Sequence, residues 1–367
     1  MRVLILVCFL IVCFKKQKLT GWIDITPQKP AKTYTDCWFI SKEKGWVSSG
    51  SKIYYTVDGG KTWNITDFDK DKISLIFKFF FLSENEGWAL CTGYSELKVA
   101  ILHWDGNEWK ISWKLENKYS DGNKSYICSS YLIKNPSWWD IYFSSPDNGY
   151  AALGSVFDSS APRNERPLML HWDGEKWSEF KFPQEIEKIL LEKPGRVHAV
   201  WCNEKEIWVG VGDIEIVSGG ETTGMKPCML HYKDGKWEWV DLPNELKEEL
   251  AWPVRIFFLN EDEGYAICYP CDILYWDGKK WNIIFTATIF DMHVFSSNDI
   301  WFVGPALFEK YDGDEWYPIT EVDSIFGGNY CIYRGIHALD KNYIWIVGDY
   351  WSDSQQRGFI LKYVGQE

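Results

Sequence analysis

A short aromatic motif that recurs along the chain restricts its possible folds more than any other feature of the sequence. In each copy a Trp or Tyr follows Gly or Ile at the start of a short apolar segment. A polar turn lies shortly upstream of each motif, and another apolar segment precedes that turn. Internal repetition of this kind indicates an architecture built from small, similar units. The seven copies are Gly45-Trp46, Gly87-Trp88, Gly149-Tyr150, Ile207-Trp208, Gly264-Tyr265, Ile300-Trp301 and Ile344-Trp345.

A third apolar segment follows the motif and in several copies ends in Asp-Gly, as at Asp105-Gly106 and Asp277-Gly278. Asp-Gly between apolar strands is a strong hairpin signal, because both residues tolerate a positive φ. Most copies then open a fourth segment with Trp, at Trp109, Trp177, Trp237, Trp281 and Trp316. This pattern predicts an all-β fold, a seven-bladed β-propeller of four-stranded antiparallel blades.

The composition excludes several other classes of protein. The 367 residues include 23 Trp, 20 Tyr and 21 Phe, and this aromatic content is incompatible with a disordered chain. Aromatic residues and the 29 glycines also disfavour a helical protein. The 52 acidic residues outnumber the 39 basic ones, for a net charge of −13, so we expect no nucleic-acid partner.

The two ends of the chain predict how the propeller closes. The seventh unit stops after its third strand, at residues 360–363. The missing fourth strand has its counterpart at residues 22–27, which resemble the fourth strand at residues 237–243. We therefore expect the N-terminal strand to complete the last blade and to remove an exposed sheet edge. Residues 19–367 then form a single propeller domain.

Residues 1–18 predict an export signal or an N-terminal anchor. The apolar run Val3–Phe14 is too short to span a bilayer but matches the hydrophobic region of a secretory signal. The run lacks a small-residue cleavage site, and its lysines follow it, so a short strand or a misassigned start is the alternative. We expect an exported protein, extracellular or in the cell envelope, with no other membrane-spanning segment.

Residues Thr56–Trp63 carry a family resemblance. Their sequence, TVDGGKTW, resembles an Asp-box, the hairpin motif of BNR-repeat propellers. That superfamily includes sialidases, sortilin-type receptors and photosystem II assembly-factor-like proteins. The other units keep only Asp-Gly and the Trp. The resemblance implies a propeller fold and no catalytic role for the motif, which in the family is a structural hairpin remote from the active mouth.

Strand order determines which loops share a face of such a propeller. Connections from second to third strands, and from one blade to the next, lie together on what we call the long-loop face. The remaining turns are short and form the short-turn face. Insertions gathered on one face of a repeat protein usually mark a binding face, although drift in unselected loops is the alternative. The long loops are Glu116–Ser137, Ser155–Arg166, Pro183–Gly195, Asp213–Lys226, Pro243–Trp252 and Asp349–Arg357.

Ionisable residues recur ten positions before the aromatic motif, near the start of the innermost strand. The next position is mostly apolar, so one face of the strand is buried and the other is polar. This predicts a polar ring at one mouth of the central channel, which Arg334 could join. The aligned residues are Asp36, Lys78, Asp140, His198, Arg255, Asp291 and Gly335.

Two interpretations of this ring remain open. Paired carboxylates are what glycoside hydrolysis requires, so Asp36, Asp140 and Asp291 are candidate catalytic residues. The same carboxylates, balanced by Lys78 and Arg255, form a solvated ion-pair ring in the alternative interpretation. A sialidase would resemble its relatives in an Arg-Ile-Pro segment, and Arg255-Ile256-Phe257 departs from that pattern.

Aromatic residues in or beside the long loops are candidate contacts for a partner. These are Trp138, Trp139, Trp252, Tyr350 and Trp351, although Trp138 could instead fill the core between blades. With Lys78, His198, Arg255 and Arg334 they form the expected binding set. Cys268 and Cys271 form a CxxC. We interpret it as a local disulfide or two free thiols, in preference to a redox-active pair or half of a zinc site.

The sequence as a whole favours a non-catalytic exported scaffold that binds a protein or a glycan on the long-loop face. A glycoside hydrolase or lyase acting at the channel mouth, and an assembly factor for an envelope or membrane complex, are the alternatives. We expect a monomer with no cofactor and no metal site.

Overall fold

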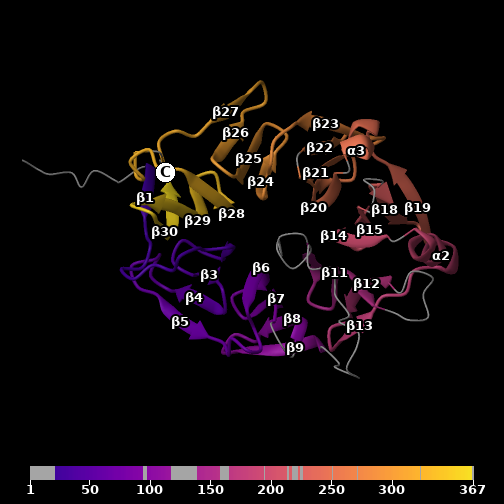
Figure 1. The fold of residues 1–367 in the computed structure, drawn as a ribbon, viewed down its shortest axis with the longest axis horizontal. Helices are drawn as coiled ribbons and strands as arrows, with labels where there is room; N and C mark the ends of the chain where they lie inside the picture. The colour runs from indigo at the N-terminus through magenta and orange to yellow at the C-terminus, as the bar shows by residue number, and fades with distance from the viewer. Residues whose placement is uncertain are drawn as a thin grey trace, which may run out of the picture.

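We describe the fold from a computed structural model. The residues described are 21–93, 97–116, 139–157, 165–193, 195–212, 215–216, 222–223, 226–249, 251–270, 272–322 and 324–365. Antiparallel sheets stand side by side around a common axis, with one strand of each sheet nearest the centre (Figure 1). The chain is an all-β propeller, as the repeated motif predicted.

Three of the sheets are simple four-stranded meanders, two near the start of the described chain and one after its middle. The first two are β2 (Cys37–Phe39), β3 (Gly45–Ser49), β4 (Lys52–Thr56), β5 (Asn64–Asp67), then β6 (Leu75–Ser83), β7 (Glu86–Thr92), β8 (Leu97–Trp104), β9 (Trp109–Glu116). The third is β20 (Trp252–Asn260), β21 (Glu263–Tyr269), β22 (Ile273–Trp276), β23 (Trp281–Phe285).

Two further four-stranded sheets complete the C-terminal part. They are β24 (Asp291–Ser296), β25 (Asp299–Gly304), β26 (Leu307–Tyr311), β27 (Trp316–Pro318), then β28 (Cys331–Asp340), β29 (Tyr343–Ser352), β30 (Gln355–Val364) with β1 (Gly21–Asp24). In the last sheet β1 is the outer strand and pairs with β30 in antiparallel register, from Gly21 opposite Val364 to Asp24 opposite Leu361.

The predicted count of seven four-stranded blades is wrong. The structure forms five four-stranded blades, and the middle of the chain forms one eight-stranded sheet. The long strand β11 joins its two halves, because Gly154 pairs with Val197 of β14. Gly154 has φ +75° and lies at a register shift in β11, so the strand bends there and approaches its neighbour.

The eight-stranded sheet has two halves. The first is β10 (Asp140–Ser145), β11 (Asn148–Phe157), β12 (Glu165–Trp172) and β13 (Trp177–Glu179). The second is β14 (Arg196–Cys202), β15 (Glu206–Gly212), β18 (Cys228–Lys233) and β19 (Lys236–Asp241), while β16 (Glu215–Ile216) and β17 (Thr222–Thr223) form a separate small hairpin.

In the described part of the chain, two short helices lie in connections between strands. Helix α2 (Gln184–Glu192) follows β13, joins the two halves of the eight-stranded sheet, and buries Ile186 and Leu190. Helix α3 (Asn244–Glu249) follows β19, leads from that sheet to the next, and buries Leu246. Among the described residues, no helix has both the length and the apolar character that a membrane span requires.

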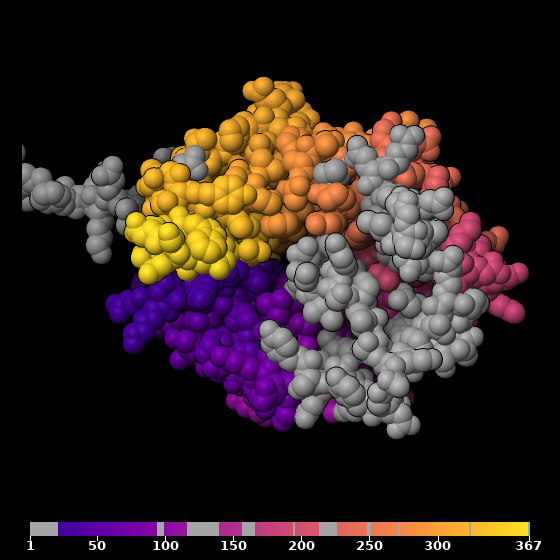
Figure 2. Space-filling view, viewed as in Figure 1, coloured from indigo at the N-terminus to yellow at the C-terminus, as the bar shows by residue number. Residues whose placement is uncertain are grey.

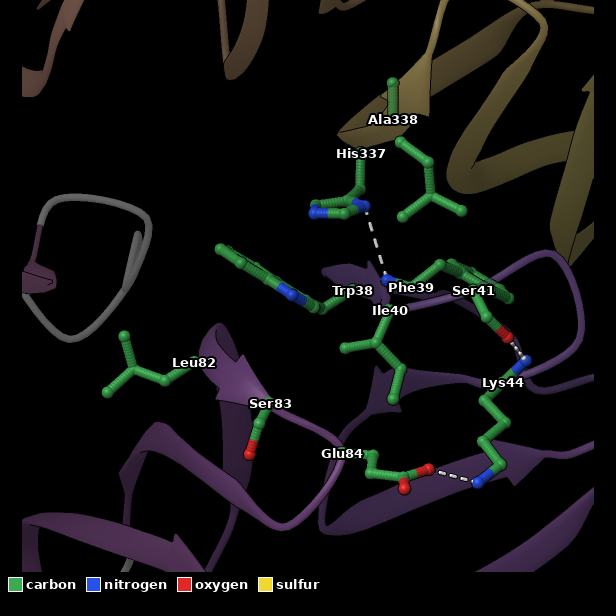
Figure 3. Close-up of a pocket in the computed structure, with 11 residues that line it drawn as sticks. Trp38, Phe39, Ile40, Ser41, Lys44, Leu82, Ser83, Glu84, His337 and Ala338 are labelled. Atoms are coloured by element: carbon green, nitrogen blue, oxygen red, sulfur yellow. Dashed lines mark hydrogen bonds and ion pairs between the residues drawn. The ribbon is translucent and has the colours of Figure 1, made fainter. Parts of the chain in front are cut away.

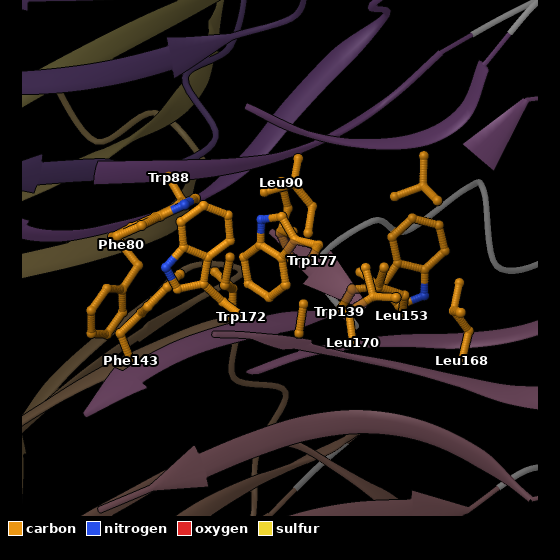
Figure 4. Packing of buried hydrophobic residues seen from close by; sticks show 14 of the residues in the cluster. Phe80, Trp88, Leu90, Trp139, Phe143, Leu153, Leu168, Leu170, Trp172 and Trp177 are labelled. Atoms are coloured by element: carbon orange, nitrogen blue, oxygen red, sulfur yellow. The ribbon is translucent and has the colours of Figure 1, made fainter. Parts of the chain in front are cut away.

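The aromatic motif packs one sheet against the next. The Trp88 ring stacks on Phe143 of β10 with ring centroids 3.7 Å apart, and Trp46 stacks on Phe81 of β6 at 4.1 Å. Around Trp88 and Phe143, the rings of Trp172 and Trp177 continue the same cluster (Figure 4). The core therefore lies between adjacent sheets, where large flat side chains fill the wedge.

The glycine before the motif has a steric role in this packing. A Cβ on Gly87 would lie 2.2 Å from the ring of Phe81, and this ring is the one that stacks on Trp46 of the preceding sheet. A side chain at position 87 would therefore disturb the contact between two sheets. Gly45, Gly149 and Gly264 face a phenylalanine ring in the same way.

The opposite face of each motif ring is covered by a residue of the third strand. His231 stacks on Trp208 with ring centroids 3.8 Å apart, and Tyr55 stacks on Trp46 at 4.9 Å. In the last two sheets a lysine takes this place, as where Lys310 lies over Trp301. This packing accounts for the recurrence of His103, His171 and His231 on third strands.

The first sheet also holds the chain segment that follows β1. Within the Asp-box-like hairpin, Asp58 accepts hydrogen bonds from the Thr62 amide at 2.9 Å and the Thr62 hydroxyl at 2.6 Å. Trp63 at the end of this hairpin donates from Nε1 to the Ile25 carbonyl at 2.9 Å. The C-terminal strands accordingly lie against the first sheet in the space-filling view (Figure 2).

Candidate functional site

Strand pairing identifies the residues that share one level of the central channel. In each innermost strand one residue pairs with the aromatic motif, and the residue two positions earlier points the same way. The residues at this level are Asp36, Lys78, Asp140, Ala199, Arg255, Asp291 and Gly335. We call them the charged ring.

The charged ring contains Ala199 at the place where the spacing of the repeats predicted His198. The β14–β15 hairpin has no register shift near its first turn, whereas β6–β7 and β20–β21 each have one there. Its ring position is therefore nine residues before the motif and not ten. His198 is instead a bulge residue, buried, with Nε2 at 3.0 Å from the Gly212 carbonyl.

Each carboxylate of the charged ring contacts the innermost strand of the following unit. Asp36 accepts a hydrogen bond from the Phe79 amide at 2.6 Å, and Asp291 accepts one from the Ile336 amide at 3.2 Å. Asp140 is hydrogen-bonded in the same sense by the Val200 amide. These carboxylates therefore link neighbouring units of the propeller.

The two cations of the charged ring form ion pairs between units of the propeller that do not follow one another along the chain. Lys78 Nζ of β6 lies 3.9 Å from Asp291 Oδ1 of β24. Arg255 Nη1 of β20 lies 3.5 Å from Asp140 Oδ1 and donates to the Trp139 carbonyl at 3.0 Å. Asp36, Asp140, Arg255 and Asp291 are buried, and the Lys78 side chain is 12% exposed. Each of these five side chains has a partner.

Burial dominates the electrostatics of the ring. It raises the pKa of Asp36 to about 6, although the Lys78 ammonium works in the opposite direction, and nearby Asp291 raises the pKa further. Burial also raises the pKa of Asp140 against the attraction of Arg255. A raised carboxyl pKa is what a general acid requires, but here both carboxylates already accept backbone hydrogen bonds.

Arg334 lies outside the charged ring. It is a bulge residue of β28 and donates from Nε to Asp349 Oδ1 of β29 at 2.5 Å. Asp349 is fully buried and also accepts from Gln356 at 2.8 Å. The three side chains connect β28, β29 and β30 on the long-loop side of the last sheet.

The candidate aromatic contacts differ in exposure. Trp139 is buried in the cluster of Figure 4, and Trp252 is half-buried beside His198 and Tyr269. Tyr350 is half-buried against Phe326. Trp351 is 48% exposed, and Trp138 lies outside the described residues.

A belt of rings that the sequence analysis did not single out lies one level below the charged ring. Its members stand two residues further along each innermost strand: Trp38, Phe80, Tyr142, Trp201, Phe257, His293 and His337. The sequence does carry a pattern for this belt, because the residue opposite the aromatic motif is aromatic or histidine in every unit. The pattern becomes regular only when β14 is aligned by its strand pairing, which places Trp201 opposite Trp208.

A pocket of about 580 Å³ opens beside this belt on the short-turn face (Figure 3). Trp38, Leu82 and His337 project into it from three different strands. The Lys44–Glu84 ion pair lies at its edge and joins the first two sheets. The pocket is thus at the opposite end of the channel from the long loops.

The cysteines of the described residues are buried. Burial raises the pKa of Cys91 and of Cys202 to about 12, which keeps these thiols protonated. Cys268 is buried at the end of β21, and Cys271 lies outside the described residues. Within the same residues, no group of three His, Cys, Asp or Glu side chains is placed to hold a metal ion.

Comparison with known proteins supports the propeller fold. A solved structure of YCF48 bound to D1 peptide has a TM-score of 0.58 and 16% identity, over 95% of this chain and 98% of that one. YCF48 from Cyanidioschyzon merolae has a TM-score of 0.56 and 13% identity, over 94% and 99%. A streptogramin B lyase structure has a TM-score of 0.57 and 11% identity, over 94% and 97%.

These neighbours are β-propeller proteins, and at such identities they show the fold alone. They do not confirm membership of the BNR family in particular. No protein-family model and no curated protein matches this chain.

Proposed function

We propose that this protein is a non-catalytic scaffold that holds a protein partner on its long-loop face, with Trp351 as the central contact. The observation that carries the proposal is the exposure of two large aromatic residues whose backbones are hydrogen-bonded to each other. Trp351 is 48% exposed and Tyr330 is 55% exposed, and the Trp351 amide donates to the Tyr330 carbonyl at 3.4 Å. Exposed, closely spaced aromatic rings are typical of interface hot spots.

The local structure holds these two rings in place. Strands β29 and β30 have ten residues each and end in a two-residue turn, where Asp353 and Ser354 both have positive φ. Below Trp351, the Arg334–Asp349 pair ties β28 to β29. A contact held rigidly before binding loses less entropy when a partner binds.

The geometry of the charged ring argues against the hydrolase alternative. Asp36, Asp140 and Asp291 each accept a backbone hydrogen bond from the next unit, and Asp140 and Asp291 also have a cationic partner. A carboxylate used in this way is occupied with holding the propeller together. The likeness to a lyase extends to the fold alone.

We also propose that the partner is an extended peptide segment of another protein. One structural neighbour is described as bound to a peptide, which shows that a propeller of this size can perform such a task. An assembly factor for an envelope or membrane complex is the specific form of this function that we favour. Export of the chain belongs to the same proposal and rests on residues 1–18, which lie outside the described residues.

The test is affinity capture followed by titration with the purified partner. Replacing both Trp351 and Tyr330 by alanine should weaken binding about tenfold or more, because a hot-spot ring contributes about 2 kcal/mol. The matched control replaces Ile65 and Ile111, which are 52% and 42% exposed on the outer strands β5 and β9. This control should bind like the parent protein.

Three results would overturn the proposal. The first is a partner whose affinity is unchanged by the double substitution. The second is retention of a glycan in place of a protein through the same two rings. The third is cleavage of a glycoside by the purified protein that Asp140→Asn abolishes.

A further inference from the structure

The pocket on the short-turn face plays no part in binding a partner on the long-loop face, yet it has the size of a ligand site. Its volume of about 580 Å³ is within the usual range for small-molecule sites. It is formed by β2 and the turn after it, the end of β6, and β28. The first and last of these strands meet only because the propeller closes.

One hydrogen-bond donor of the pocket has a defined orientation. The Phe39 amide donates to His337 Nδ1 at 3.3 Å, so a neutral His337 must carry its proton on Nε2. Burial, with His293 and Lys78 nearby, lowers the pKa of His337 well below its usual value, so the ring is neutral at pH 7. The other side of the His337 ring lies beside Trp38 (Figure 3).

Aromatic and apolar side chains form one part of the pocket wall, and Ser41, Ser83, Lys44 and Glu84 also line it. The Trp38 ring lies 4.5 Å from His337 and 5.2 Å from Phe80 between ring centroids. Leu82 and Leu339 also line the pocket, and Leu339 is 38% exposed. The only charged side chains among the lining residues are Lys44 and Glu84, which neutralise one another.

We propose that this pocket binds a neutral, planar aromatic molecule that carries a hydrogen-bond acceptor. The ring of the ligand stacks on Trp38, and its acceptor receives the Nε2 hydrogen of His337. A cation finds no unpaired carboxylate among the lining residues, and a saturated ring forfeits the stacking contact. The site is separate from Trp351, so the two proposals stand or fall independently.

The test uses three small probes and saturation-transfer NMR on the whole protein. Benzamide has an aromatic ring and a carbonyl acceptor, benzylammonium has the ring with a charge, and cyclohexanecarboxamide has the acceptor without the ring. We expect benzamide to bind at least about fivefold more tightly than either of the others, the scale of one aromatic contact.

Substitutions identify the site. Trp38→Leu and His337→Phe should abolish benzamide binding, whereas Ile111→Ala on the outer strand β9 should leave it unchanged. Leu339 is partly exposed, so Leu339→Glu keeps the fold and provides the test if the other variants fail to fold. It should weaken benzamide and strengthen benzylammonium.

The proposal fails if benzamide does not bind, if the parent protein prefers benzylammonium or cyclohexanecarboxamide, or if Leu339→Glu leaves the order of the three probes unchanged. Equal benzamide binding by folded Trp38→Leu would also overturn it. None of these results bears on capture of a protein partner through Trp351.

Discussion

At the scale of single residues, the charges of the channel serve mainly to join units of the propeller. Asp36 illustrates this, because its carboxylate reaches out of its own unit to the Phe79 amide. The carboxylate is buried, and burial outweighs the attraction of Lys78 in raising its pKa to about 6. Asp36 is therefore more important as a hydrogen-bond acceptor than as a charge.

This balance predicts a pH-dependent effect of Asp36→Asn. Asparagine keeps the acceptor and removes the charge. Since the folded pKa of about 6 lies above the unfolded value, the folded protein binds more protons between about pH 4 and 6. The contribution of Asp36 to the unfolding free energy therefore decreases as pH rises through this window.

Asp36→Asn should accordingly match the parent protein near pH 4 and exceed its unfolding free energy at pH 8, by on the order of 1 kcal/mol. Chemical denaturation at both pH values measures this difference. Asp36→Ala, which also removes the acceptor, is the control and should be less stable at both. A loss of stability in Asp36→Asn at pH 8 would show that attraction to Lys78 outweighs burial.

At the scale of elements, the contact between neighbouring sheets depends on a glycine, a phenylalanine and a tryptophan from two sheets. Gly87 of β7 leaves space for Phe81 of β6, and Phe81 stacks on Trp46 of β3. Phe81 cannot move aside without leaving Trp46. The Gly-aromatic motif recurs in the sequence because this packing between sheets requires both a glycine and a large ring.

Gly87→Ala should therefore destabilise the protein by about 1 to 3 kcal/mol, the usual cost of overpacking. Thermal unfolding measures the loss. Adding Phe81→Leu to Gly87→Ala should recover part of it, because the smaller side chain makes room for the new methyl group. If the double variant is as unstable as the sum of both single variants, the two positions are not coupled.

The same elements show which parts of the structure the sequence could predict. Asp-Gly identified hairpin turns correctly, since Gly106, Gly174 and Gly278 all have positive φ. The number of sheets was wrong because it depends on Gly154 meeting Val197, a contact between strands that no local pattern announces. Likewise, His337 and Trp38 meet only in the closed propeller, so the pocket could not be inferred from spacing along the chain.

At the scale of the whole molecule, the first described strand completes the last sheet. Trp22 of β1 packs on Phe308 and Tyr363, each with ring centroids 5.3 Å apart, so β1 contributes to the core between two sheets. Beyond β1, Ile25 accepts the hydrogen bond from Trp63 of the first sheet. Residues 21–27 therefore hold the two ends of the propeller together.

Deleting residues 1–27 should cost about 3 to 5 kcal/mol of unfolding free energy, because it removes a paired strand together with the packed ring of Trp22, and should expose the edge of β30. Thermal unfolding and light scattering measure the two effects. Deletion of residues 1–18 is the matched control, since it leaves β1 intact. Equal melting of both truncated proteins would rule out a role for β1 in closure.

The pairing of Gly21 with Val364 has a topological consequence. The first and last strands of the described chain start and finish beside each other, so a short peptide could join them and the backbone could be opened at another surface turn. The propeller would then be the same object with its strands synthesised in a different order. What defines this fold is a cyclic sequence of strands, and the position of its cut is a separate choice.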